Sequence, residues 1–217
     1  MEHPVENYWQ IKLERVAAAL TANSFDAHIA TDMAAARDLV MEKILPACGA
    51  KTASFGGSVT VFKSGLYEAI TGREELEVID TIDPSVAPEE KMERRRQALL
   101  ADFFVTGTNA VTEGGQLVNL DMIGNRVGAL TFGPKKVVLV AGRNKIVPDL
   151  DTAMDHIKSY VAPANAMRLD MKTPCVKTGR CEACKSPARI CNTWTITEKS
   201  FPKKRVSVVL VNADAGL

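Results

Sequence analysis

The sequence predicts an α/β fold in which a largely parallel β-sheet is flanked by helices. Segments with apolar residues at helical spacing alternate along the chain with short β-branched segments, which is the order expected of strand–helix–strand units. The run KVVLVA at 136–141 shows no alternation of apolar and polar residues, as expected for a strand buried on both faces.

The first half of the chain contains a regular alternation of predicted helices and strands. In the segment 4–22 the apolar residues fall on one stripe of a helix. Thr31 or Asp32 can cap the next helix, and Pro46 is expected to end it. The predicted order is a helix over 4–22, a strand over 27–30, a helix from 32 to 44, a strand over 51–54, a short helix after the turn 55–58, a strand over 76–80 and a charged helix with an exposed arginine run over 88–100.

The second half continues the alternation until a cysteine-rich segment interrupts it. The predicted order is a strand over 103–106, a polar turn over 108–115, strands over 116–121 and 136–141, a helix over 148–161 that starts at its proline, and a strand over 205–211. The whole chain, 1–217, is predicted to form one domain. The segment 172–194 is expected to be an insertion before the last strand, because it would otherwise be an over-long loop.

Composition excludes several classes of protein. Twenty-seven Lys and Arg residues against 26 Asp and Glu residues leave a net charge of +1, which gives no electrostatic basis for general nucleic-acid binding. Apolar runs such as 137–141 are far shorter than the roughly 20 residues of a membrane-spanning helix. The first residues have no signal-peptide pattern, so a cytoplasmic protein is expected. A homo-oligomer is compatible with this composition.

The loop SFGGSVT at 54–60 follows a predicted strand and opens a helix. In open α/β sheets, ligands bind outside the carboxyl ends of the strands. Gly56 and Gly57 allow a ligand to approach the backbone closely, and Ser58 and Thr60 add hydroxyl donors. The loop is therefore a candidate site for a small anion such as a phosphate, and the alternative is a tight turn with a serine cap.

A second candidate loop, 106–115, follows the strand at 103–106 and leads into the strand at 116–121. Its polar side chains among turn glycines suggest one wall of a binding site. Glu113 is a candidate general base or carboxylate nucleophile, or else an exposed turn acid. Asp121 is a second catalytic candidate, or forms a structural ion pair with Arg126. The remaining candidate ligand-binding residues are Gly107, Thr108, Asn109, Gly114, Gly115 and Asn119.

Four of the five cysteines lie between Cys175 and Cys191, with Cys181 and Cys184 forming a CxxC pair. With no export signal, metal binding is favoured over a disulfide framework. The spacing matches neither a two-knuckle zinc site nor a ferredoxin motif. Basic side chains interleave with the cysteines and would offset the negative charge of either a [4Fe–4S] cluster or a four-cysteine zinc site. Free or reversibly oxidised thiols are the third alternative.

The run ADFFVTGTNAVTEGGQLVNLDMIGNRVGALTFGPKKVVLVAGRNKIVPDLDTAMDHI at 101–157, together with SFGGSVT, resembles the LUD-domain family of lactate-utilisation proteins. The resemblance covers residues 4–211. It implies a fold similar to the sugar-phosphate isomerase and CoA-transferase-like α/β domains, whose equivalent loops bind a phosphate, a carboxylate or a CoA thioester. It also implies iron–sulfur redox partners and favours [4Fe–4S] over zinc at the cysteines. Glu113 lies near the nucleophilic glutamate of the CoA transferases, but its flanking residues do not match their motif.

These observations predict a LUD-type protein that takes part in the oxidation of lactate or a related small organic acid and carries a [4Fe–4S] cluster. Its ligand would be a small anionic metabolite or a phosphate- or CoA-like molecule. Two alternatives remain open. One is a non-catalytic accessory subunit with a structural four-cysteine metal site, and the other is a CoA- or phosphate-dependent enzyme in which Glu113 does covalent chemistry.

Overall fold

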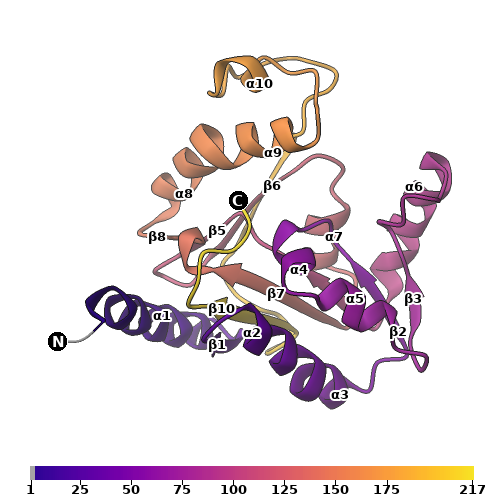
Figure 1. Cartoon of the computed structure of the whole chain (residues 1–217), viewed down its shortest axis with the longest axis vertical. Helices are drawn as coiled ribbons and strands as arrows, with labels where there is room; N and C mark the ends of the chain where they lie inside the picture. The colour runs from indigo at the N-terminus through magenta and orange to yellow at the C-terminus, as the bar shows by residue number, and fades with distance from the viewer. Residues whose placement is uncertain (1–2) are drawn as a thin grey trace.

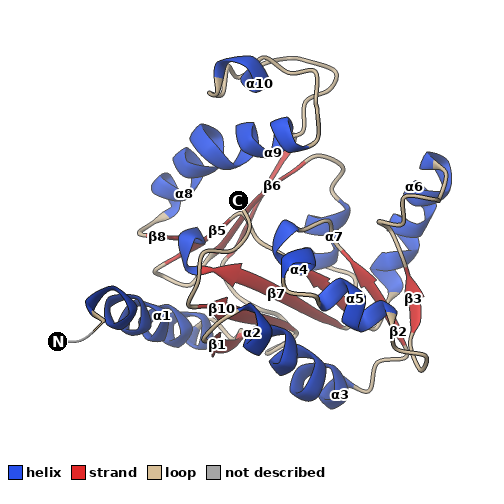
Figure 2. Ribbon diagram, viewed as in Figure 1, coloured by secondary structure: helices blue, strands red, loops and turns tan. Residues whose placement is uncertain are grey.

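The computed structural model describes residues 3–217, and its centre is a six-stranded β-sheet in the order β1-β10-β7-β4-β2-β3 (Figures 1 and 2). Neighbouring strands in this sheet pair in parallel. The strands are β1 (Asp26–Ala30), β2 (Thr52–Phe55), β3 (Glu77–Ile79), β4 (Phe103–Thr106), β7 (Lys136–Gly142) and β10 (Val206–Val211). The predicted sheet is confirmed, and the predicted ends of each strand lie within about one residue of the observed ones.

Helices cover both faces of this sheet. Helices α2 (Met33–Leu39), α4 (Val59–Lys63) and α5 (Leu66–Thr71) pack on one face, and α1 (Pro4–Ala22) and α7 (Asn125–Thr131) pack on the other. The other α-helices of the described residues are α3 (Leu45–Cys48), α6 (Pro88–Gln97), α8 (Leu150–His156), α9 (Ala162–Arg168) and α10 (Cys175–Thr178). The first helix has the predicted bounds. The predicted cap of α2 is also confirmed, because Asp32 Oδ1 accepts a hydrogen bond of 2.9 Å from Ala35 N.

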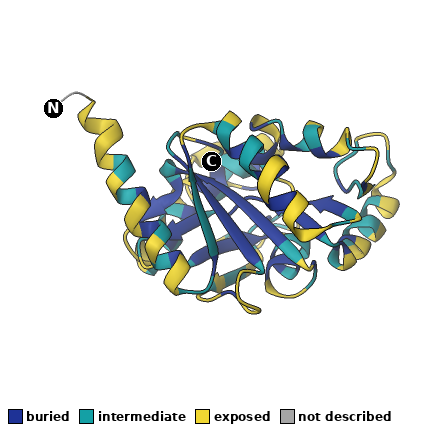
Figure 3. Ribbon diagram, turned by 90° about the horizontal axis from the view of Figure 1, so that it is seen from below, coloured by how far each residue is buried: buried dark blue, intermediate teal, exposed yellow. Residues whose placement is uncertain are grey.

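Strand β7 is buried on both faces, as its unalternating sequence predicts. Val138 and Val140 pack into a hydrophobic group with residues of α2, α4 and α5. Val137 and Leu139 point to the other face and pack with residues of α1 and α7. Figure 3 shows strands of the sheet in dark blue, with helices around them whose outer faces are exposed.

The prediction that Pro46 ends the second helix is wrong. The backbone passes from α2 through a π-helical turn (Val40–Ile44) into α3, and Leu45 N–H donates to Val40 O. Hydrogen bonds in such a turn span five residues instead of four, so the proline nitrogen, which carries no hydrogen, needs no acceptor.

The same arrangement recurs later in the chain. A π-helical turn (Ile157–Val161) joins α8 to α9 just before Pro163. The helix predicted over 148–161 therefore runs to Arg168, and it begins at Leu150 instead of its proline. Asp149 supplies the cap, with Oδ1 2.8 Å from Thr152 N. This extension places α9 where it borders two cavities described below.

A second sheet, which the sequence analysis did not separate from the first, stands beyond the carboxyl ends of the parallel strands (Figure 2). Its order is β8 (Ile146–Val147), β5 (Ala110–Thr112), β6 (Leu117–Asp121) and β9 (Thr193–Thr197). Strand β6 pairs antiparallel with both β5 and β9. Strand β5 lies within the segment that was predicted to be a polar turn, and its three residues are too few for a periodicity to show.

The cysteine-rich segment follows α9 and leads into β9, so that β9 separates it from the last strand, β10. In Figure 1 the segment, with the short helix α10, projects at the top of the molecule, away from the six-stranded sheet. Within residues 3–217, no helix has the length and apolar composition needed to cross a membrane.

Candidate functional site

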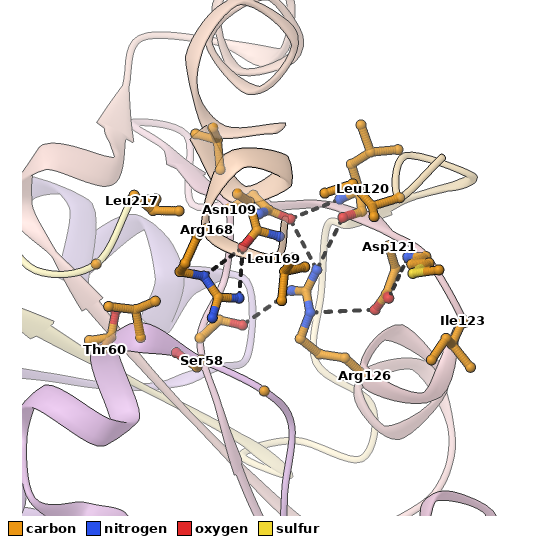
Figure 4. Close-up of a pocket in the computed structure, with 18 of the residues that line it drawn as sticks. Ser58, Thr60, Asn109, Leu120, Asp121, Ile123, Arg126, Arg168, Leu169 and Leu217 are labelled. Carbon is orange, nitrogen blue, oxygen red and sulfur yellow. Dashed lines mark hydrogen bonds and ion pairs between the residues drawn. The ribbon is translucent and has the colours of Figure 1, made fainter. Parts of the chain in front are cut away.

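A cavity of about 500 Å³ lies at the carboxyl ends of the parallel strands. The loops after β2, β4, β7 and β10 all reach it and contribute Ser58, Gly107, Lys145 and Gly216, respectively. Residues of α6 and α9 complete the wall. Figure 4 shows the close-up, in which side chains from these separate elements point toward one space.

The cavity is strongly cationic. Its described lining includes five basic side chains and one acidic side chain, namely Lys91, Arg95, Arg126, Lys145 and Arg168 against Asp121. The only acid is itself paired, because its Oδ2 lies 3.4 Å from Arg126 Nε. The remaining positive charge favours an anionic ligand.

Arg126 ties the walls of the cavity together. All five of its N–H groups have oxygen partners: Nε faces Asp121 Oδ2, Nη1 donates to Gly107 O at 3.3 Å and to Asn119 Oδ1, and Nη2 donates to Asn109 Oδ1 at 3.0 Å and to Leu120 O at 3.3 Å. Figure 4 shows this guanidinium between Asp121 and Asn109. Because its donors are already used, Arg126 contributes charge to the site more than free hydrogen-bonding groups.

Lys145 is the buried cation without a carboxylate partner in the described part of the chain. Only 5% of its surface is exposed. Its Nζ donates to Thr108 O at 2.9 Å and to Thr60 Oγ1 at 3.4 Å. Burial, with a smaller contribution from Arg126, lowers the pKa of Lys145 to about 8.

Most of the predicted ligand-binding residues meet at this cavity. Those that line it are Gly57, Ser58, Thr60, Gly107, Thr108 and Asn109, and the catalytic candidate Asp121 lines it too. Two others lie just behind the wall. Gly56 N donates to Val105 O at 2.9 Å, and a Cβ at Gly56 would come within 2.5 Å of Thr106 Oγ1. Asn119 is fully buried and accepts from Arg126.

Glu113, Gly114 and Gly115 do not line the cavity. Glu113 Oε1 lies 2.9 Å from Lys12 Nζ on α1, so this carboxylate forms an ion pair at a separate place. The carbonyls of both glycines accept hydrogen bonds from Asn23 Nδ2. This part of the loop therefore contacts the end of α1, because β5 and the turn after it carry the chain away from the sheet edge.

Several cations of the site were not predicted from the sequence. Lys91 and Arg95 lie four residues apart on α6, which places them on one helical face, and both line the cavity. The arginine run was expected to be a solvated helix face, and Arg95, which is half-buried, also lines the cavity. The four-residue spacing was a usable signal, but nothing local predicted that α6 lies beside the loop after β2. Lys145 and Arg168 had no local signal.

The four clustered cysteines share a second, smaller cavity. Cys175, Cys181, Cys184 and Cys191 line a space of about 20 Å³, together with apolar residues of α9. Ile190 belongs to the linings of both this cavity and the large cationic one. The two cavities are therefore neighbours, with Ile190 between them.

Hydrogen bonds organise the loop that carries these cysteines. Arg189 donates to Cys191 O at 2.8 Å and to Cys184 O at 3.0 Å, and thereby holds two of the cysteine backbones together. Ala183, whose φ is 47°, donates its N–H to Cys181 Sγ at 3.4 Å. N–H donors to sulfur are among the features that tune thiolate-held clusters.

Comparison with known proteins gives the family. The model of the LUD domain matches residues 13–211. The chain belongs to the LUD-domain family. A solved structure described as a DUF162 family protein from Deinococcus radiodurans is similar to this LUD domain, with a TM-score of 0.51 and 14% sequence identity. The similarity covers 94% of this chain and 98% of that one, and it supports the α/β fold. None of the curated proteins compared with the chain matches it.

The four cysteines of this LUD domain are a suitable donor set for a thiolate-held metal centre. Their side chains, however, are not spaced as the ligands of one metal ion. Within residues 3–217, no three His, Cys, Asp or Glu side chains form a group that could hold a metal ion. A cluster is bulkier than one ion and separates its cysteines more widely. The space that the four cysteines line measures only about 20 Å³.

Proposed function

We propose that this LUD domain binds a small organic anion in the cationic cavity and takes part in the oxidation of lactate or a related hydroxy acid. The observation that carries the proposal is the lining of five basic side chains and one acid that is already paired. A cavity of about 500 Å³ matches a small metabolite, or part of a larger phosphate- or CoA-like ligand.

The free donors of the site support recognition of a carboxylate or phosphate. Arg168 uses Nε and Nη2 to donate to Asn165 Oδ1, which leaves its other nitrogen, Nη1, for a ligand. Ser58 and Lys145 add a hydroxyl and an ammonium from the loops after β2 and β7. Charge-assisted hydrogen bonds of this kind are about twice as strong as neutral ones.

We further propose a [4Fe–4S] cluster at Cys175, Cys181, Cys184 and Cys191, with zinc as the second candidate. A bound cluster would supply one-electron transfer. The oxidation of lactate to pyruvate releases two electrons and two protons, so this proposal also requires a redox partner, for which an iron–sulfur protein is suitable. The basic side chains near the cysteines would offset the negative charge of the thiolates.

Calorimetric titration tests the anion site. We expect lactate, pyruvate, inorganic phosphate or CoA to bind, and the variants Lys145→Met and Arg168→Gln each to weaken that binding by about tenfold, the loss typical of one charged hydrogen bond. Lys135→Gln is the matched control, because Lys135 is exposed and pairs with Asp102 outside the cavity. If none of the four probes binds, or if both variants bind the probe with the affinity of the wild type, the cavity is not the anion site.

Metal analysis of anaerobically prepared protein tests the cysteine site. We expect iron and acid-labile sulfide in equal amounts, with a visible absorption band that dithionite bleaches. Zinc, or a cluster that dithionite does not reduce, would instead support a structural role and an accessory subunit. Protein with neither metal would reject the proposed site. If metal is found, the double variant Cys181→Ser, Cys184→Ser should lose it.

A further inference from the structure

We propose that the Nζ amine of Lys145 forms an imine with the carbonyl carbon of a small 2-oxo acid in the cationic cavity. The inference rests on the proposed function, because pyruvate is the 2-oxo acid that the oxidation of lactate produces. It assigns to Lys145 a covalent role, whereas the proposed function needs only its positive charge.

The surroundings of the amine favour this chemistry. Lys145 is 5% exposed, and its two hydrogen-bond partners, Thr108 O and Thr60 Oγ1, are uncharged oxygens. No carboxylate of residues 3–217 pairs with it, so no counterion holds the amine in its protonated form. The backbone approaches the amine from another side, since a Cβ built on Gly216 would lie 3.1 Å from Nζ. The open direction is the cavity, which Lys145 lines.

The protonation state supports the same role. A lysine attacks a carbonyl only as the neutral amine. Burial and the nearby Arg126 lower the pKa of Lys145 to about 8. In about a tenth of the protein molecules the Lys145 amine is then neutral at pH 7. For a lysine of ordinary pKa this fraction is well under a thousandth.

The same cavity selects the class of carbonyl compound. Arg168 and Ser58 line it and offer donors for a carboxylate group. A 2-oxo acid carries its carboxylate next to the carbonyl carbon, so one small molecule can contact both the anion donors and the amine. Aldehydes and ketones without a carboxylate lack the charge that would hold them here.

The step is balanced without any further reactant. The nitrogen lone pair of neutral Lys145 forms a bond to the carbonyl carbon. The two amine protons move to the carbonyl oxygen, the carbon–oxygen bond breaks, and the oxygen leaves as water. The product is a C=N bond between Lys145 and the acid. Thr60 Oγ1, 3.4 Å from Nζ, is placed to pass a proton between the nitrogen and the oxygen.

Reductive trapping tests the proposal. Whole protein is incubated with pyruvate and sodium cyanoborohydride, which reduces the imine and fixes the adduct. We expect one adduct per chain, with a mass increase equal to pyruvic acid less one oxygen atom, and peptide mapping should place it on Lys145. The variant Lys145→Arg keeps the charge but cannot form an imine, so it should give no adduct. Lys203→Arg, on the surface, should trap as much as the wild type.

The outcomes separate this inference from the proposed function. Lactate has no ketone, so its binding in calorimetry reports the anion site alone. If lactate binds but pyruvate gives no adduct, or only adducts scattered over surface lysines, Lys145 is an anion-binding residue and the imine is rejected. If neither acid binds and no adduct forms, both proposals fail. Should Lys145→Arg not fold, the peptide map of the wild type still decides.

Discussion

Arg126 and Lys145 are cations of one cavity, and the protein surrounds their charges differently. The guanidinium faces the Asp121 carboxylate and four further oxygens, which use all its donors. The ammonium faces two uncharged oxygens. At the scale of single residues, Arg126 therefore holds the loops of the site in place, and the charge of Lys145 is left for a ligand.

Replacement of Arg126 by Met should strongly destabilise the fold. The change keeps most of the apolar volume but leaves the Asp121 carboxylate and several buried oxygens without a donor. We expect the free energy of unfolding to fall by about 3–5 kcal/mol, the usual cost of breaking a buried ion pair. Urea denaturation followed by circular dichroism measures it. Arg96→Gln, at an exposed pair with Glu93, is the control and should change stability by less than about 0.5 kcal/mol.

Lys145 should make stability rise with pH above neutrality. Because its pKa is about 8 in the folded chain and 10.5 in the unfolded chain, the unfolded chain binds more protons between these values. Burial of the charged ammonium lowers the free energy of unfolding by about 3 kcal/mol below pH 8. This loss disappears as the pH rises toward 10.5. The stability of the wild type minus that of Lys145→Met should therefore increase between pH 7 and pH 10.

The comparison with Lys145→Met isolates this titration. Arg126 and His156 are the charged or titratable groups that interact with Lys145, and both are present in the two proteins. Arg126 stays charged throughout this range, and the lowered pKa of His156 lies below it. A difference that stays constant from pH 7 to pH 10 would show that Lys145 titrates as an ordinary exposed lysine.

At the scale of elements, the turn after β5 acts as a contact with α1 and not as part of the binding site. Gly115 has a φ of +79°, and a Cβ there would lie 2.8 Å from the backbone of Ala19 and Leu20. Gly115→Ala should therefore lower stability by at least about 2 kcal/mol, because both the backbone conformation and the packing become unfavourable. Thermal or urea unfolding measures this, and the folded fraction should bind anions as the wild type does.

Gly57 gives the matched control for this change. A Cβ at Gly57 meets nothing within 4 Å, and its φ is not in the left-handed region. Gly57→Ala should thus leave stability within about 0.5 kcal/mol of the wild type. If Gly115→Ala instead proves stable and loses anion affinity, the turn belongs to the site after all.

Helix α6 contributes charge to the cavity through one of its faces. The double variant Lys91→Gln, Arg95→Gln should bind phosphate about tenfold more weakly. Each partly exposed charge accounts for about threefold of this loss. The loss should shrink as salt rises, because exposed charges are screened. Calorimetry at two salt concentrations measures both effects. A double variant of Arg96 and Lys135, which removes equal charge outside the cavity, should bind phosphate normally.

The elements themselves were largely predictable from the sequence. Long periodic or β-branched segments, such as 4–22 and 136–142, fold as their patterns indicate, because tertiary packing follows the same apolar stripes. The failures have local causes. Pro46 lies after a π-helical turn, which no propensity scale includes, and β5 is only three residues long. The assignment of β5 and β6 to a second sheet depends on β9, which lies more than 70 residues later.

At the scale of the whole molecule, the position of the site was predictable and its charges were not. The rule that ligands bind at the carboxyl ends of parallel strands correctly indicated the loops with Ser58 and Gly107. Arg95, Lys145 and Arg168 come from three other elements that only the complete fold brings together. Spacing along the chain contains no information about such contacts.

The two sheets share their hydrophobic cores. Val111 and Leu117 of the second sheet pack with α1 and with the six-stranded sheet. Their neighbours Ala110 and Val118 point the opposite way and pack with residues of α8. Because alternate residues of the same strands enter both groups, neither sheet can lose its structure without exposing the core of the other. We therefore expect residues 3–217 to unfold as one cooperative unit.

The two tryptophans test this cooperativity from two different hydrophobic groups. Trp9 on α1 packs against the core below the six-stranded sheet, and Trp194 on β9 packs against the group around α8. In the variants Trp9→Phe and Trp194→Phe, the remaining tryptophan reports on one region. We expect both fluorescence transitions in urea to have the same midpoint and slope as the circular dichroism transition of the same variant. An earlier transition at Trp194 would mean that β9, and the cysteine segment attached to it, unfolds separately from the parallel sheet.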